Sequence, residues 1–162
     1  MAKKITGLEP RGFRWVITGR LAISERIGGH GFQHRRVRRE EEITWLGEHG
    51  INAVLSLLPG NQNQAAYEAA GFSFFTHPIE GELEDRAEVN KVFETMDDAL
   101  RPKGAAVLIH RDIIDDMLAG LLAGYLVHSR LVQDPIIATD VIQKIVGRPI
   151  GPEGRRLIPV KG

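Results

Sequence analysis

The sequence predicts an α/β domain in which helices flank a mostly parallel central sheet. Two observations support this prediction. Apolar runs of strand length alternate with helical patterns along the chain, and the runs are continuously apolar, as in strands covered on both faces. The length of 162 residues suits one domain with a well-buried core. We expect this domain to span residues 13–148, between an N-terminal tail of residues 1–12 and an irregular C-terminal tail of residues 149–162.

Four apolar runs are the predicted strands. They cover residues 13–19, 51–58, 72–79 and 104–110. The second run is closed by the turn residues "PGNQ", and the third follows a glycine that ends a short helix. Residues 19–29 are glycine-rich but lack the spacing of a nucleotide-binding loop, so we assign them no chemistry.

Five segments between and after these runs are the predicted helices. They cover residues 40–50, 64–71, 84–100, 113–127 and 134–147. The first begins with acidic residues and ends at a glycine. The third places its apolar residues on one face, whereas the fourth is apolar nearly all round, which predicts a central helix buried by its neighbours. The fifth opens with Asp134 and Pro135, an N-cap followed by proline at the first helical position.

The composition excludes several classes of function. The chain contains no cysteine, which excludes disulfides, thiolate metal sites and every mechanism with a cysteine nucleophile. Its 21 basic residues balance 21 acidic ones, so net charge does not favour nucleic acid or an anionic membrane as a partner. The sequence contains no apolar run long enough to span a membrane, and its N-terminus does not resemble a secretory signal. We therefore expect a soluble, cytoplasmic protein.

The order of these segments resembles that of the cysteine-dependent dual-specificity and protein tyrosine phosphatases. The similarity runs from about Trp15 to Arg148, and it is carried by "RWVITGRLA", "WLGEHGINAVLSL", "YEAAGFSFFTHPI" and "KGAAVLIH". Active sites in this family carry His-Cys, five variable residues, Arg and then Ser or Thr, usually with a glycine three residues after the cysteine. The resemblance implies the same α/β fold, with the site after the strand that ends at His110.

This chain departs from the family pattern at every position after His110. Arg111 stands at the nucleophile position, Ile114 at the loop glycine, Met117 at the phosphate-binding arginine and Leu118 at the hydroxyl position. An arginine is a poor nucleophile because it stays protonated. A β-branched isoleucine resists positive φ, and methionine offers neither charge nor donors to a phosphoryl group.

Three acids in the same loop suggest what replaces the phosphate site. Asp112 stands where an N-cap would be and Asp115 follows three residues later, the spacing of a capping box. Together with Asp116 they would repel a phosphate dianion, so we expect the loop to be a self-capped helix start. The general acid that the family carries after the preceding strand aligns with Glu80 or Gly81, and Glu80 is a candidate residual acid.

The same residues allow a second interpretation, a divalent-metal site. His110, Asp112, Asp115 and Asp116, joined by His77 at the neighbouring strand end, are suitable ligands for Mg²⁺, Mn²⁺ or Zn²⁺. Such a site would support a metal-assisted hydrolase. We favour the capping interpretation, in which His110 bonds to nearby backbone, and the sequence itself implies no cofactor.

A basic segment allows a third interpretation, a binder of phosphorylated ligands or nucleic acid. Its arginines are Arg35, Arg36, Arg38 and Arg39. The alternative is a solvated helix start with ion pairs from Arg36 to Glu40 and from Arg38 to Glu42, which would leave the segment nearly neutral.

These patterns favour a pseudophosphatase, a phosphatase-like domain with a binding or regulatory role. We expect no phosphatase activity, and the question of a different activity stays open. The expected partner is another protein; a phosphorylated ligand is a further candidate, nucleic acid is not favoured and no membrane contact is expected.

Overall fold

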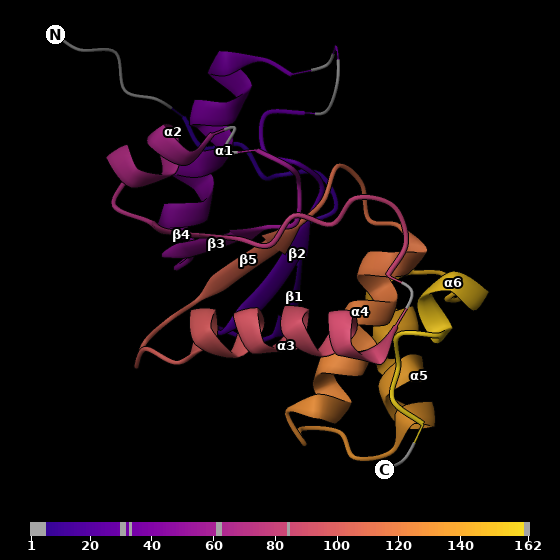
Figure 1. The fold of residues 1–162 in the computed structure, drawn as a ribbon. Coiled ribbons are helices and arrows are strands. Elements are labelled where there is room, and N and C mark those ends of the chain that lie inside the picture. The colour runs from indigo at the N-terminus through magenta and orange to yellow at the C-terminus, as the bar shows by residue number, and fades with distance from the viewer. Residues whose placement is uncertain (1–5, 30–31, 33, 61–62, 84, 161–162) are drawn as a thin grey trace, which may run out of the picture.

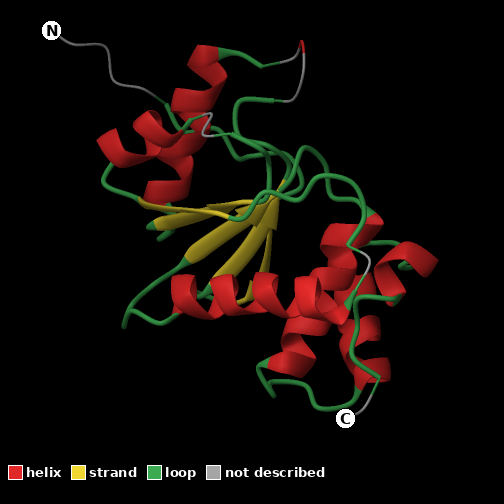
Figure 2. Cartoon of the chain, in the orientation of Figure 1, coloured by secondary structure: helices red, strands yellow, loops and turns green. Residues whose placement is uncertain are grey.

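The computed structural model describes residues 6–29, 32, 34–60, 63–83 and 85–160. Its five strands are β1 Arg14–Ile17, β2 Leu21–Ser24, β3 Ala53–Ser56, β4 Ser73–Thr76 and β5 Val107–His110. They form one sheet in the order β1-β2-β5-β3-β4. All neighbouring strands are parallel except β1 and β2, which are antiparallel. The predicted mostly parallel α/β sheet is therefore confirmed (Figure 2).

Within the described residues, six helices flank the two sides of the sheet, and α6 packs on α4 (Figure 1). They are α1 Arg36–Glu48, α2 Gln64–Ala69, α3 Arg86–Leu100, α4 Asp116–His128, α5 Pro135–Val146 and α6 Pro152–Arg155. Helices α1 and α2 lie on one side of the sheet, and α3 to α6 lie on the other. Within the described residues, no helix combines the length and apolar character that a membrane span requires.

Strand β5 shows why the central runs are apolar at every position. Val107 and Ile109 pack in the core with α3, α4 and α5, whereas Leu108 packs in the core with α1 and α2. Successive side chains of a strand point to opposite faces, so a strand covered on both faces must be apolar throughout. The central helix is also confirmed, because every residue of α4 from Leu118 to Leu126 is buried.

Three elements differ from the prediction. Strand β2 lies in the glycine-rich segment where the sequence predicts no strand, and its four residues are all buried between β1 and β5. Helix α1 begins at Arg36, so the acids expected in its first turn lie in its second. Residues 149–160 are not irregular throughout, since α6 forms there and Ile150, Leu157 and Ile158 join the core. Elements as short as β2 and α6 are stabilised by tertiary packing, and the local periodicity of the sequence does not predict such packing.

Candidate functional site

The candidate site is the loop that joins β5, the central strand, to α4. His110 ends β5 and lies in register with Ser24 of β2 and Ser56 of β3. The loop of residues 111–115 follows at the carboxyl edge of the sheet, and α4 begins at Asp116. In α/β sheets this edge is where ligands bind. The loop after His110, which the sequence predicts as the site, therefore lies at the edge of the sheet where α/β proteins bind ligands.

His110 is a buried, neutral side chain. It is only 2% exposed, and its Nδ1 atom lies 3.1 Å from the carbonyl oxygen of Arg111. Burial penalises the charged imidazolium and lowers the pKa of His110 to about 4, although the bond to the Arg111 carbonyl partly opposes this shift. At neutral pH the ring therefore carries no charge, as expected for a histidine bonded to nearby backbone.

The start of α4 is capped by Asp115. Its Oδ1 atom accepts a hydrogen bond from the backbone N–H of Leu118 at 2.9 Å. The loop is thus self-capped, but the prediction of Asp112 as N-cap is wrong by three residues. Asp112 lies before the helix, where its carbonyl accepts a hydrogen bond from the backbone N–H of Arg26 at 3.2 Å.

Each acid of the loop has its own arginine. Asp112 pairs with Arg26 at 3.6 Å, Asp115 with Arg111 at 3.8 Å and Asp116 with Arg148 at 3.2 Å. Arg148 also donates to the carbonyl of Ile114. Three positive charges therefore offset the three negative ones. Each of the three carboxylates therefore has a cationic partner within the protein.

The two positions that would carry phosphatase chemistry contact each other. The Arg111 guanidinium, at the nucleophile position, donates to the sulfur of Met117, at the position of the phosphate-binding arginine. Ile114, at the position of the loop glycine, belongs to the apolar core instead and packs against Gly12. The loop thus folds onto its own helix start. Ile113 is its exposed apolar side chain, with 47% of its surface accessible.

The C-terminal segment packs directly on this loop. A Cβ atom on Gly154 would overlap the backbone carbonyl of Asp116, and one on Gly151 would overlap the Asp116 carboxylate. Only glycine permits so close an approach. Arg148, which precedes this segment, also contacts the loop. The loop is thus completed by Arg148, the predicted last residue of the domain, and by Gly151 and Gly154 of the predicted tail. The pattern "IGPEGRR" carries a signal for α6, because proline follows Gly151 at the first helical position.

The structure does not form the metal site. His77 lies at the neighbouring strand end, but its Nδ1 atom is 2.8 Å from the Thr95 hydroxyl, and burial lowers its pKa. Across the described residues, no group of three or more His, Asp or Glu side chains is placed to hold a metal ion. Glu80, the candidate residual acid, lines a hollow of about 220 Å³ with His77 and Glu88. No residue of the 110–117 loop lines that hollow.

The four arginines of the basic segment do not converge. The predicted ion pairs form, with Arg36 to Glu40 at 3.2 Å and Arg38 to Glu42 at 3.1 Å. Arg35 donates to backbone carbonyls of its own segment. Arg39 points the other way, toward Asn63. Arg26, which precedes this segment and was not predicted as a site residue, pairs with Asp112 in the loop after β5.

Comparison with known proteins identifies the fold. No family model and no curated protein matches the sequence. The structure of kinase associated phosphatase with serine in place of its catalytic cysteine is similar over 84% of this chain and 82% of its own, with 18% identity and a TM-score of 0.67. Human DUSP28 matches over 94% and 93%, with 19% identity and a TM-score of 0.61. TpbA of P. aeruginosa matches over 94% and 92%, with 16% identity and a TM-score of 0.65. The fold predicted from the resemblance is confirmed.

Proposed function

We propose that this protein is a pseudophosphatase, a phosphatase-like domain whose role is to bind or regulate another protein in the cytoplasm. The absence of cysteine carries the proposal, because phosphatases of this fold that work through a thiolate need one. A phosphoryl-enzyme intermediate therefore has no cysteine on which to form. Arg111 stands at the position of the cysteine, and a guanidinium is a poor nucleophile.

The geometry of the loop supports the same proposal. A phosphate bound after β5 would be held by free N–H groups at the start of α4 and by an arginine in its first turn. Here Asp115 already accepts from the Leu118 N–H, and Met117 replaces the arginine. The three loop acids would have to leave Arg26, Arg111 and Arg148 before an anion could use those cations. One donor that would receive a phosphate, the Leu118 N–H, is thus occupied by a carboxylate of the protein itself.

The exposed part of the loop supports a protein partner. Ile113 presents an apolar side chain at the edge of the sheet where a catalytic loop would present a phosphate cradle. An apolar contact suits a protein surface better than a charged small molecule. Arg111 and Asp115 lie beside it as an ion pair that a partner could meet with its own polar groups.

An activity assay tests the proposal directly. Purified protein is incubated with p-nitrophenyl phosphate and with a phosphotyrosine peptide, beside an active dual-specificity phosphatase as positive control. We expect no release of phosphate above buffer. Turnover that follows this protein through successive columns would refute the proposal. The binding role is tested by comparing partners retained by the wild type and by Ile113→Glu, which places a charge on the exposed apolar position.

A further inference from the structure

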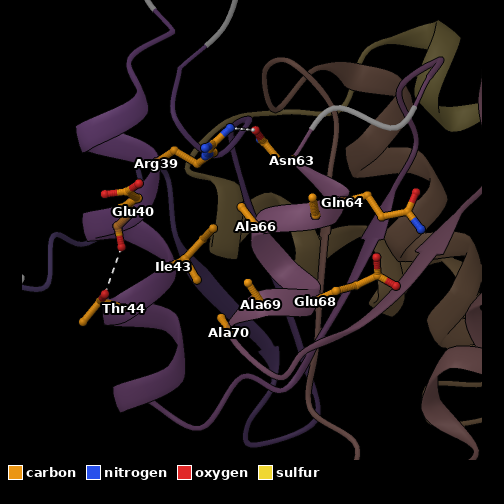
Figure 3. A pocket seen from close by; sticks show the side chains of 11 residues that line it. Arg39, Glu40, Ile43, Thr44, Asn63, Gln64, Ala66, Glu68, Ala69 and Ala70 are labelled. Atoms are coloured by element: carbon orange, nitrogen blue, oxygen red, sulfur yellow. Dashed lines mark hydrogen bonds between the residues drawn. The ribbon is translucent and has the colours of Figure 1, made fainter.

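A groove lies between α1 and α2, and we call it the α1–α2 groove (Figure 3). Its volume is about 860 Å³. Ile43, Ala66, Ala69 and Ala70 line it with apolar surface. Alanine side chains are short, so the space between the two helices can receive larger side chains from another helix.

Two charged side chains on the wall of the α1–α2 groove, Arg39 and Glu68, form no ion pair with any described residue. Arg39 donates to the neutral side chain of Asn63 at 3.3 Å. Figure 3 shows the two charges at separate places on the wall. The third charged residue of the groove, Glu40, pairs with Arg36 at 3.2 Å. The groove therefore offers one cation and one anion beside its apolar surface.

Apolar side chains gather on the surface around the start of α5. Ile136, Ile137 and Val160 are 79%, 54% and 89% exposed. Together with Pro159 they line one hollow of about 540 Å³ between α5 and the end of the described chain, and we call these four residues the α5 patch. Exposed apolar residues that adjoin one another mark contact sites on soluble proteins.

An acid and a base continue the α5 patch along the helix. Asp140 and Lys144 follow Ile136 in steps of four residues, so the three side chains share one side of α5. Asp140 and Lys144 pair with each other at 2.9 Å but stay 56% and 77% exposed. A pair so exposed contributes little, so either member can exchange its partner for another charge.

The α5 patch and the α1–α2 groove complement each other but cannot meet within one chain. Helices α1 and α2 lie on one side of the sheet and α5 lies on the other (Figure 1). The patch offers large apolar side chains beside an acid and a base, and the groove offers short apolar side chains beside a base and an acid. The chain carries 21 basic and 21 acidic residues, so net charge does not keep two copies apart.

We infer that the α5 patch of one copy of this chain docks in the α1–α2 groove of a second copy. Ile136 and Ile137 then cover the alanines of the groove, while Asp140 meets Arg39 and Lys144 meets Glu68. The contact joins two different surfaces, so each copy keeps one patch or one groove free and further copies can add head to tail. The loop after β5 takes no part, and the inference does not depend on the proposed function.

Sedimentation velocity of the full chain tests the inference. We expect the average mass to rise above that of one chain as the concentration increases from about 5 μM to 500 μM. Ile136→Glu places a charge in the patch, and Ala69→Glu places one in the groove. Each is expected to weaken self-association by about tenfold or more, because the contact would bury a carboxylate that has no partner. Both residues are exposed, so neither change disturbs the core.

An equimolar mixture of these two variants tests which surfaces meet. The Ile136→Glu copy keeps an intact groove and the Ala69→Glu copy keeps an intact patch, so the mixture is expected to form a dimer and nothing larger. That dimer would also show that both variants fold.

Two matched variants serve as controls. Val37→Glu changes an exposed apolar residue of α1 that does not line the groove, and Ala87→Glu changes an exposed alanine of α3. Both are expected to associate as the wild type does. A wild type that stays a single chain at every concentration would overturn the inference. So would association that survives Ala69→Glu, or a mixture in which the two variants stay apart.

Discussion

The loop after β5 and the buried side chain of Tyr67 on α2 differ in how their polar atoms are satisfied. In the loop, Asp115 caps α4 and each acid meets an arginine. The Tyr67 hydroxyl makes no hydrogen bond among the described residues, and burial raises its pKa.

The difference shows that the position of a polar group in a fold does not decide whether the group is satisfied. The carboxyl edge of the sheet is where this fold places ligands, yet there the protein supplies its own carboxylates. Tyr67 lies away from that edge, yet its hydroxyl has no partner among the described residues. Whether a buried polar group is satisfied follows from the contacts around it, not from the topology alone.

Acid titration gives the strongest test of the buried loop. The pKa of His110 is about 4 in the folded protein and is ordinarily 6.5. The stability that the buried, neutral ring contributes is therefore fully present above pH 6.5 and is lost as the pH falls through 4. We expect the wild type to lose about 3 kcal/mol more free energy of unfolding between pH 7 and pH 4 than His110→Asn. Denaturant unfolding at several pH values measures this difference. Equal pH dependence in both proteins would mean that His110 is accessible to protons in the folded state.

Removal of the cap tests which acid begins α4. Asp115→Ala leaves the Leu118 N–H without its partner and is expected to lower the free energy of unfolding by about 1 kcal/mol. Asp112→Ala is the matched control; its carboxylate is 53% exposed, so the loss is expected to stay below about 0.5 kcal/mol. Urea unfolding at pH 7 compares the two. A larger effect at Asp112 would return the cap to the residue that the sequence suggests.

A pair of tyrosines tests whether the Tyr67 hydroxyl is unsatisfied. The Tyr125 hydroxyl donates to Asp97 at 2.7 Å, so Tyr125→Phe is expected to lower the free energy of unfolding by about 1 kcal/mol. The Tyr67 hydroxyl has no such partner among the described residues, so Tyr67→Phe is expected to leave the free energy of unfolding unchanged or to raise it by less than about 1 kcal/mol. Thermal unfolding of the two variants measures the contrast. Equal losses would show that Tyr67 has a partner in solution.

Sequence reasoning located the loop because its members are close along the chain. His110, Asp115 and Asp116 follow one another at the end of an apolar strand, and the capping pattern is local. It could not choose between Asp112 and Asp115, because the choice depends on Arg26, which lies more than eighty residues earlier. It also grouped Arg35 to Arg39 as one surface, whereas the turn of α1 directs Arg36 and Arg39 to different partners.

The amino-acid sequence alone determined the class of fold and the loss of cysteine chemistry. Continuous apolar runs require a sheet covered on both faces, and a missing thiolate is missing in every conformation. The tertiary structure decided that Arg148 and α6 complete the loop, that each loop acid pairs with an arginine, and that the buried Tyr67 hydroxyl has no hydrogen-bond partner among the described residues. These outcomes depend on contacts between residues far apart in the chain, and local patterns carry information only about neighbours along the backbone and the burial of one face.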